Sequence, residues 1–431
     1  MNKNDNEKIS DEEIIDVEAE DLKTVTEEEL EKYINPPADV IKKTASLWQY
    51  KPVPDNEPEP YEEYTSSESE HNGFRITGAR VRGKKHKHEG TNCDDWFEYE
   101  TVGDWCIMAV SDGAGSKKFS RIGAMESCRA AIGHIREQLE NISVEQVEKL
   151  SLPREDALFV EGCSFFASML QDSVIKARDS VIKAYEERKT KFEYLKLLDR
   201  DLEVKDFSGT FLVCMLLPVS VDGEKEYFVV ACQIGDGIIC SVDNNAEFDK
   251  ALRLLSEPDN GVYSGETDFL TSESINRKEN LMVKTKIMRG KTSAVMLMTD
   301  GVADDYFPNS PQLLRLYLDL ELNGIFDIPI YKENSEKKLP DNIPEPVSYP
   351  WVNDNAKTVA VQYANKISEE TGCTLEELWN NRDIINKASL QNFGTELPIL
   401  RKDRLLRWLD NYTERGSFDD RTLLICKIME K

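Results

Sequence analysis

Six short apolar runs, each bounded by glycine, aspartate or another turn residue, constrain the fold of this 431-residue chain more than any other feature. They are Phe74–Gly83, Trp105–Ser111, Gly209–Val219, Tyr227–Ile234, Ser293–Thr299 and Arg421–Ile428. Runs of this length that are rich in β-branched residues are typical of strands. Because they are apolar at successive positions, we expect strands that are buried on both faces, as in a sandwich of sheets with helices outside.

Amphipathic segments predict the helices that cover these strands. One helical face carries apolar residues spaced three or four apart, namely Ile122, Met125, Cys128, Ile132, Ile135 and Leu139. A second, long helix is expected over roughly residues 156–198. Ser310-Pro311 is a helix-opening pair before a leucine-rich stretch, and residues 374–377 form a capping-box pattern that opens another helix.

The first 70 residues differ from the rest of the chain. They hold 21 acidic and 7 basic residues, and six prolines fall between Pro36 and Pro60. A segment of this composition cannot bury enough apolar surface to offset the entropy that it loses on ordering. We therefore expect residues 1–70 to be a disordered acidic arm and residues 71–431 to be the folded domain.

A long excursion separates the fifth apolar run from the last one. It contains the two capped helices and a loop with five prolines between Pro329 and Pro350. Stretches this long inside a compact domain are often functional lids or binding elements. We expect residues 303–410 to contain an inserted lid or helical subdomain beside the main sheet.

Composition narrows the partners and the compartment. The formal net charge of −27 repels phosphate backbones, so we expect no nucleic-acid partner. The nine cysteines include no CxxC pair, and several lie within apolar runs, which is typical of buried thiols in a reducing compartment. The chain shows no signal pattern at its start and no apolar run near the ~18–20 residues of a membrane span. We expect a cytoplasmic protein that does not bind a membrane.

Five apolar strands carry an aspartate at one end. Asp112, Asp236 and Asp300 each follow a run and precede a glycine, whereas Asp94-Asp95 and Asp419-Asp420 precede strands. A single aspartate in this place is an ordinary turn residue. If the ends converge, the carboxylates repel one another unless cations lie between them. Oxygen ligands select Mg²⁺ or Mn²⁺, and a two-metal carboxylate site is typical of enzymes that hydrolyse phosphate esters.

Six motifs occur in a characteristic order: Cys93–Phe97, Val110–Ser116, Ser208–Phe211, Ile234–Gly237, Met298–Val302 and Asp419–Thr422. In this order they resemble the PPM, or type 2C, metal-dependent serine/threonine protein phosphatases. The resemblance covers about residues 75–431, and the opening from His86 to Asp95 is similar to that of bacterial members. It implies an α+β fold, a four-layer α-β-β-α sandwich of two antiparallel sheets flanked by helices, with metals at one end.

The resemblance also implies roles for the acidic residues. Asp112 would bridge two Mn²⁺ or Mg²⁺ ions, and Asp236 matches the position that helps to bind a weaker third ion in bacterial members. Asp95 would hold a metal-bound water. The full set of metal ligands that the resemblance implies is Asp94, Asp112, the Gly113 carbonyl, Asp236, Asp300 and Asp419.

Two positions depart from the family pattern. Many members carry an arginine five residues before the second acid, where it binds the substrate phosphate, and this place is Gly90 here. Arg82, His86 and Lys85 are the candidates to supply that cation, and we take Arg82 as the predicted phosphate-binding residue. The first acid is Asp94, where family members usually carry Glu or Gln. Its side chain is one methylene shorter than that of Glu, so a water would enter the coordination sphere or the binding of one metal ion would be weaker.

The predicted activity is hydrolysis of phosphoserine and phosphothreonine in proteins by a water that two metal ions activate. His86 or His88 is the candidate proton donor, with His86 taken as the predicted catalytic residue, since imidazole titrates near neutrality. Alternatively, the histidine is an exposed member of the basic patch 84–88. The expected partners are a phosphorylated protein and a cognate Ser/Thr kinase or its targets. Two other functions stay open. One is a pseudophosphatase that binds phosphoproteins or a kinase, motivated by Gly90, and the other is a hydrolase of small phosphate esters or a nuclease.

Overall fold

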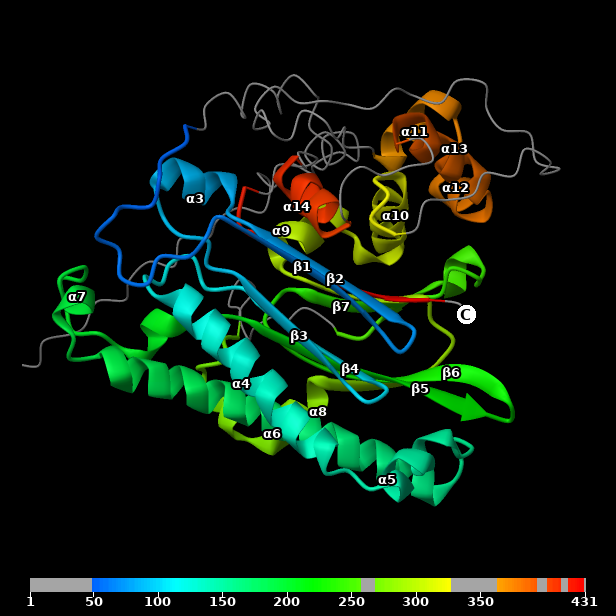
Figure 1. Ribbon diagram of the computed structural model, residues 1–431, viewed down its shortest axis with the longest axis horizontal. Coiled ribbons are helices and arrows are strands. Elements are labelled where there is room, and N and C mark those ends of the chain that lie inside the picture. Colours follow the sequence, from blue (N-terminus) through cyan, green and yellow to red (C-terminus); the bar gives the residue numbers. More distant parts are fainter. Residues whose placement is uncertain (1–48, 257–267, 327–362, 394–400, 412–417, 430–431) are drawn as a thin grey trace, which may run out of the picture.

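Two antiparallel β-sheets stack face to face in the centre of the protein (Figure 1). The structure is a computed structural model, and it describes residues 49–256, 268–326, 363–393, 401–411 and 418–429. The first sheet has the strand order β1-β2-β11-β10-β7-β8, and the second has the order β3-β4-β5-β6-β9. Apolar side chains from both inner faces, such as Ile76, Val110 and Leu212, form the core between them.

The strands include all six that the apolar runs predict. The first sheet contains β1 (Tyr64–His71), β2 (Phe74–Val81), β7 (Ile238–Val242), β8 (Leu252–Leu254), β10 (Ala294–Met298) and β11 (Arg421–Ile428). The second contains β3 (Trp96–Val102), β4 (Trp105–Ser111), β5 (Phe211–Val221), β6 (Glu224–Ile234) and β9 (Thr285–Gly290). Every residue of β4 and of β10 is buried, as expected for strands that are covered on both faces.

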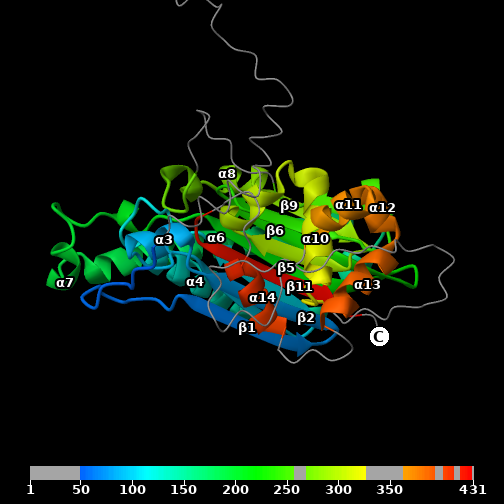
Figure 2. The same ribbon diagram turned by 90° about the horizontal axis from the view of Figure 1, so that it is seen from above.

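Helices cover the outer face of each sheet and complete the four-layer α-β-β-α sandwich that the sequence predicts (Figures 1 and 2). α4 (Ser120–Glu140) and α6 (Ala157–Arg188) pack on the second sheet, whereas α10 (Asn309–Leu322) and α14 (Arg401–Asn411) pack on the first. The expected apolar face of α4 is present, because Ile122, Cys128 and Ile135 are all fully buried.

Shorter helices connect these layers. They are α3 (Lys84–Glu89), α5 (Val144–Glu148), α7 (Phe192–Leu195), α8 (Lys278–Val283), α9 (Asp300–Ala303), α11 (Ala364–Thr371), α12 (Leu375–Asn380) and α13 (Arg382–Phe393). The predicted capping box opens α12, where the Thr374 hydroxyl accepts from the Glu377 N–H and the Glu377 carboxylate accepts from the Thr374 N–H. The helix expected over residues 156–198 is interrupted, since α6 ends at Arg188.

Among the described residues, α6 is the one helix that is long and apolar enough to cross a membrane, judged by length and composition alone. Its apolar side packs against α4 and the second sheet, and Phe166, Leu170 and Val174 are fully buried there. This side of α6 therefore belongs to the outer helical layer of the sandwich.

The helices of the predicted insert form part of the main fold. α10 contributes Leu313, Leu316 and Leu320 to the core under the first sheet, and α14 packs on β1 and β2. These two helices of the predicted lid or helical subdomain over residues 303–410 thus supply the outer layer of the first sheet. Residues 327–362 and 394–400 of the predicted insert lie outside the described residues.

The predicted boundary of the acidic arm at residue 70 falls inside a strand. Residues 64–70 form most of β1, which pairs along its whole length with β2. The preceding segment, residues 49–63, is here called the strap. Its Glu57 is buried against Lys118 and Arg121, and its Glu59 accepts from Arg188. These ion pairs satisfy the acidic charges that suggested disorder, while residues 1–48 lie outside the described residues.

The antiparallel register brings the acidic strand ends together. Ser111 at the end of β4 pairs with Trp96 at the start of β3. In the other sheet Met298 at the end of β10 pairs with Leu423 near the start of β11. Because the end of each antiparallel strand meets the start of its neighbour, the aspartates beyond these residues meet at one end of the sandwich.

Candidate metal centre

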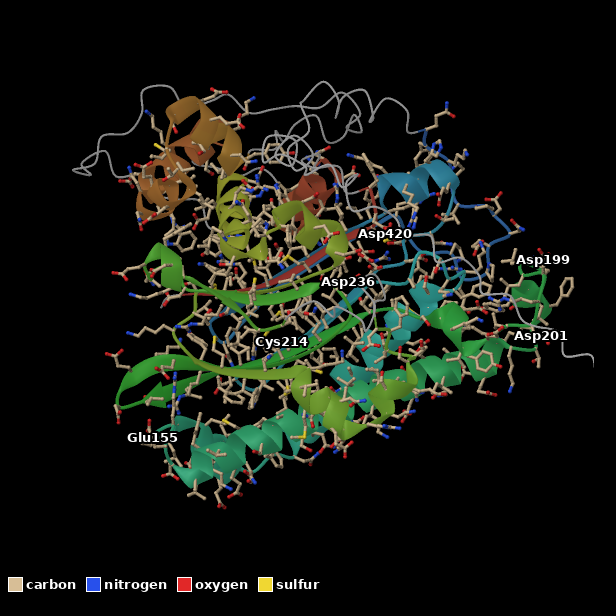
Figure 3. The ribbon with its side chains drawn as sticks, turned by 180° about the vertical axis from the view of Figure 1, so that it is seen from behind. Glu155, Asp199, Asp201, Cys214, Asp236 and Asp420 are labelled. Carbon is tan, nitrogen blue, oxygen red and sulfur yellow. The ribbon has the colours of Figure 1, made fainter. Side chains whose placement is uncertain are left out.

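Three aspartates from separate segments gather at this end, and we call Asp112, Asp236 and Asp300 the carboxylate cluster. Each is half-buried, and one oxygen of each carboxylate lies within 4.8 Å of the other two. Asp112 follows β4, Asp236 follows β6, and Asp300 opens α9 directly after β10. Figure 3 shows Asp236 and Asp420 toward the same end of the sheets, whereas Glu155 lies at the opposite end. The three carboxylates are close enough to share a cation.

A glycine turn carries Asp236 from one sheet to the other, since β6 belongs to the second sheet and β7 to the first. Gly235 has a φ of +100°, and a Cβ there would lie 2.5 Å from the Thr210 Cγ2. A Cβ on Gly237 would lie 2.5 Å from the Met298 carbonyl oxygen. Only glycine fits on either side, and the two close approaches fix the position of Asp236 between the sheets.

Asp95 is fully buried beside the carboxylate cluster and links its segments. Its Oδ2 accepts hydrogen bonds from the Thr299 Oγ1 at 3.0 Å and from the Thr422 Oγ1 at 2.7 Å. Asp95 therefore links the end of β10 to the start of β11 next to the predicted ligands, and its predicted hold on a water stays a prediction.

A second group, which we call the histidine cluster, consists of His86, Asp94 and Asp420, all of them buried. The Asp420 Oδ2 accepts from the His86 Nδ1 at 2.8 Å and from the Asp94 backbone N–H at 2.5 Å. The Asp420 Oδ1 accepts from the Gly83 N–H at 2.6 Å. Asp420 thus joins the turn before β11 to both ends of the segment between β2 and β3.

Arg82 holds the backbone of His86 in place. Its guanidinium is buried and donates from Nη2 to the His86 carbonyl at 2.8 Å and to the Lys51 carbonyl at 2.9 Å. Its Nη1 donates to the Glu63 carboxylate at 2.6 Å. A guanidinium engaged in this way points into the protein, so its placement does not support the predicted contact with a substrate phosphate.

Crowding raises the pKa values of the carboxyl groups. Burial, followed by the charges of Asp300 and Asp95, holds the pKa of Asp112 well above its usual range. Burial and then the Asp236 charge raise the pKa of Asp300 to about 7. A divalent cation between these oxygens would relieve the same repulsion.

The histidine cluster neutralises part of its own charge. Burial alone would lower the pKa of His86, but Asp420, Asp94 and Asp419 outweigh it and raise the pKa to about 10. Burial alone would raise the pKa of Asp420, but His86 and the two backbone donors lower it. Burial and then the Asp420 charge raise the pKa of Asp94 to about 7. An ion pair between His86 and Asp420 thus lies inside this cluster.

The remaining predicted ligands lie near both clusters. Asp419 is 43% exposed at its side chain, and its Oδ1 lies 3.7 Å from the His86 Nε2. Its charge also acts on Asp112 and Asp300. Gly113 runs close to the Asp94 backbone, since a Cβ there would lie 2.5 Å from the Asp94 carbonyl oxygen. The structure thus gathers all six predicted ligand positions at one end of the sandwich.

Gly90 occupies a place where an arginine would not fit well. It ends α3 with a φ of +81°, and its N–H donates to the His86 carbonyl at 2.9 Å. A Cβ there would lie 3.3 Å from the Pro52 carbonyl oxygen of the strap. The left-handed backbone and the strap together explain why this position carries glycine.

Sequence reasoning did not assign a role to Asp420, Thr299 or Thr422. All three lie inside motifs that were recognised, next to Asp419 or Asp300. A second acid directly before a strand was the available signal for Asp420. Its partners Gly83 and His86 are more than 330 positions away, so the contact itself has no local signature.

The described geometry agrees with the comparisons with known proteins. A family model described as "Protein phosphatase 2C" matches residues 82–321. No curated protein matches the chain. RsbX in complex with magnesium is 12% identical, with 84% of this chain and 100% of that chain covered and a TM-score of 0.30. A bacterial serine phosphatase is 11% identical, with 83% and 98% covered and a TM-score of 0.34. A phosphatase from a pathogenic strain of Toxoplasma gondii is 10% identical, with 85% and 96% covered and a TM-score of 0.37.

The sandwich and its carboxylate end define a metal-binding protein phosphatase of the PPM type. Since the matching model spans more than half of its length, the chain belongs to the protein phosphatase 2C family. The residues present fit the divalent ions of that family. The carboxylate cluster offers only hard oxygen ligands, which such ions prefer.

Proposed function

We propose that this protein hydrolyses phosphoserine and phosphothreonine side chains of proteins and that it depends on Mn²⁺ or Mg²⁺. The observation that carries the proposal is the carboxylate cluster, in which Asp112, Asp236 and Asp300 approach within 4.8 Å of one another. Three carboxylates this close repel one another unless protons or cations offset their charges, and a divalent cation can offset all three at once. We further propose that the substrates are targets of a cognate Ser/Thr kinase.

The ligands of the proposed ions come from both clusters. Asp112, Asp236 and Asp300 would hold ions on one side, and Asp94, the Gly113 carbonyl and Asp419 would complete the other positions, for two ions and a weaker third. When bound, such ions acidify a water and stabilise the charge that develops on the phosphoryl oxygens.

The other residues of the site position this ligand set. Asp95 fixes Thr299 and Thr422, which adjoin Asp300 and Asp419–Asp420. Each carboxylate therefore comes from a segment that is tied to its neighbours, so little reorganisation is needed before the reaction. We propose this positioning role for Asp95 in addition to its predicted contact with a water.

The cation that binds the substrate phosphate must come from a residue other than Arg82, whose guanidinium is buried among its partners. Lys85 is the one lysine among the three candidates for this contact. It is half-buried in α3, and its backbone N–H donates to the Phe418 carbonyl at 2.8 Å, directly before Asp419. We propose Lys85 for the phosphate contact.

A second candidate function is a pseudophosphatase that binds phosphoproteins or a kinase without hydrolysis. Gly90 favours it, because the strap and the backbone exclude the arginine of many family members from this place. The complete set of acids at the site favours the enzyme instead. The two functions differ in whether phosphate is released.

The test is Mn²⁺-dependent release of phosphate from a phosphoserine peptide by the full-length protein. We expect turnover with Mn²⁺, none with EDTA, and a loss of more than about 100-fold in Asp112→Asn. The control is Asp199→Asn, an exposed aspartate far from the site, which should keep full activity (Figure 3). Tight peptide binding without phosphate release would support the pseudophosphatase, and neither binding nor release would contradict both functions.

A further inference from the structure

His86 is 2% exposed, and its Nε2 makes no hydrogen bond to another described residue. The nearest polar atom recorded for it is the Asp419 Oδ1 at 3.7 Å, which is too long for a hydrogen bond. A Cβ on Gly115 would lie 3.7 Å from the same nitrogen. Nε2 therefore faces Asp419 and the loop that follows Asp112.

Asp420 determines which ring nitrogen is available. Its Oδ2 accepts from the His86 Nδ1 at 2.8 Å, while backbone donors occupy the rest of the carboxylate. Since the carboxylate accepts, a hydrogen must lie on Nδ1, and in the neutral ring the lone pair then lies on Nε2. Histidines that bind metals usually donate their other ring nitrogen to a carboxylate in this way, which orients the ring and makes it a better ligand.

The surroundings of Nε2 are anionic. An Asp94 carboxylate oxygen lies within 4.8 Å of a His86 ring nitrogen and of an Asp420 oxygen, and Asp419 approaches from the β11 side. Two ligands that each lie about 2.1 Å from one ion are separated by about 3.0–3.4 Å at angles between octahedral and tetrahedral. The 3.7 Å between Nε2 and the Asp419 Oδ1 is slightly longer than this separation.

The position of His86 is fixed before any ion binds. Its carbonyl oxygen accepts three hydrogen bonds, from the Gly90 N–H at 2.9 Å, the Thr91 N–H at 3.1 Å and the Arg82 Nη2 at 2.8 Å. The backbone and the ring are thus held independently, one by Arg82 and the end of α3 and the other by Asp420. A general acid needs to reach the leaving group, whereas this fixed and buried ring is suited to hold an ion.

We propose that His86 Nε2 is a ligand of the cation on the Asp94–Asp419 side of the site and that Asp420 is the positioning residue that orients it. The inference rests on the proposed metal-dependent function. Any proton on Nε2 in the metal-free protein leaves to solvent when the ion binds, as ligand protons generally do.

The consequence is a preference among ions. Mg²⁺ favours oxygen ligands and retains its waters, whereas first-row transition ions such as Mn²⁺ accept imidazole more readily. A nitrogen ligand therefore makes this side of the site selective for Mn²⁺ over Mg²⁺, while the carboxylate cluster accepts either ion. His86 would add a nitrogen ligand on one side of the site, while the other side has oxygen ligands.

The direct test is electron spin-echo envelope modulation on the full-length protein loaded with less than one equivalent of Mn²⁺. We expect modulation from a coordinated nitrogen-14 in the wild type and its replacement by the nitrogen-15 pattern when histidine is labelled. The modulation should disappear in His86→Gln and remain in His134→Gln, a half-buried histidine of α4. The labelled wild type supplies an answer even if His86→Gln fails to fold.

Calorimetry separates a ligand from a structural residue. His86→Gln should weaken Mn²⁺ binding by about 10-fold or more and change Mg²⁺ binding by less than about 3-fold, whereas structural damage would weaken both equally. Bound Mn²⁺ without nitrogen modulation, or modulation that persists in His86→Gln, would overturn this inference and leave the proposed function standing. A wild type that binds no Mn²⁺ would overturn both.

Discussion

The carboxylate cluster and the histidine cluster lie at the same end of the sandwich but are built differently. Asp112, Asp236 and Asp300 are half-buried at strand ends, and their cluster consists of carboxyl groups alone. His86 and Asp420 are buried and form an ion pair. Like charges dominate the first cluster, whereas opposite charges and the Asp420 hydrogen bonds hold the second in place. One site can thus combine an ion-dependent half with a preorganised half.

The largest expected effect is the loss of activity in Asp300→Asn. Removing one of the three like charges should lower phosphate release by more than about 100-fold, because a ligand is lost. The same change should raise the melting temperature of the metal-free protein, because the repulsion with Asp112 and Asp236 is relieved. Phosphate release and thermal unfolding in EDTA are the measurements, with Asp199→Asn as the control. If Asp300→Asn kept both the activity and the stability of the wild type, the contrast between the two clusters would be wrong.

Substitution in the histidine cluster should have the opposite effect on stability. Asp420→Ala removes the acceptor of His86, Gly83 and Asp94 and leaves a buried imidazole without its partner. We expect Mn²⁺ affinity to fall by about 10- to 100-fold and the metal-free protein to melt at a lower temperature. Calorimetry and thermal unfolding report the two changes. Asp420→Asn keeps an acceptor and should lose less, and equal losses in both variants would argue against a positioning role.

The pH dependence of the metal-free protein should separate His86 from the buried carboxyl groups, which include Asp94 of the histidine cluster. A carboxyl whose pKa is higher in the folded chain binds more protons there, so stability falls as the pH rises. For Asp300 the window runs from 3.8 to about 7. The contribution of His86 is complete below 6.5 and is lost as the pH rises toward about 10. We expect the melting temperature in EDTA to fall over both windows.

Variants assign each window to its cluster. Asp300→Asn should flatten the fall between pH 4 and 7, and His86→Gln should flatten the fall above pH 7. Saturating Mn²⁺ should reverse the lower window, because the ion binds only deprotonated carboxylates. Identical profiles for the wild type and Asp300→Asn would show that the carboxylate cluster is not the source of the repulsion.

The smallest expected effect concerns Gly90, which supports the histidine cluster through the His86 carbonyl. Gly90→Ala forces a side chain into a left-handed backbone beside the strap and should lower the free energy of unfolding by about 1 kcal/mol. Gly133→Ala is the matched control, because a Cβ there meets nothing within 4 Å and α4 should gain helix propensity. Chemical denaturation measures both, and equal effects would remove the strain argument.

Short-range patterns predicted much of the fold. The six apolar runs are strands, and the face spaced from Ile122 to Leu139 lies on α4, because burial on both faces and helical spacing are local properties. The strands β1, β7, β8 and β9 had no such signature, since they are short or polar. The acidic composition of residues 49–70 likewise concealed a folded strap and edge strand.

Side-chain direction was beyond the reach of the sequence. Arg82 was expected to face a substrate phosphate, but the structure turns it inward to Glu63, Lys51 and His86. A basic residue near a predicted site has the same local sequence in either orientation. Which orientation is adopted depends on the strap, which crosses α3 from a different part of the chain.

The sequence by itself determined the carboxylate part of the site, because aspartates at the ends of apolar strands are a local pattern that supplies hard oxygen donors. The tertiary structure alone decided that Asp420 would join His86 and that Asp236 would lie between the sheets, because both depend on strand register and on the close packing of glycines far apart in the chain.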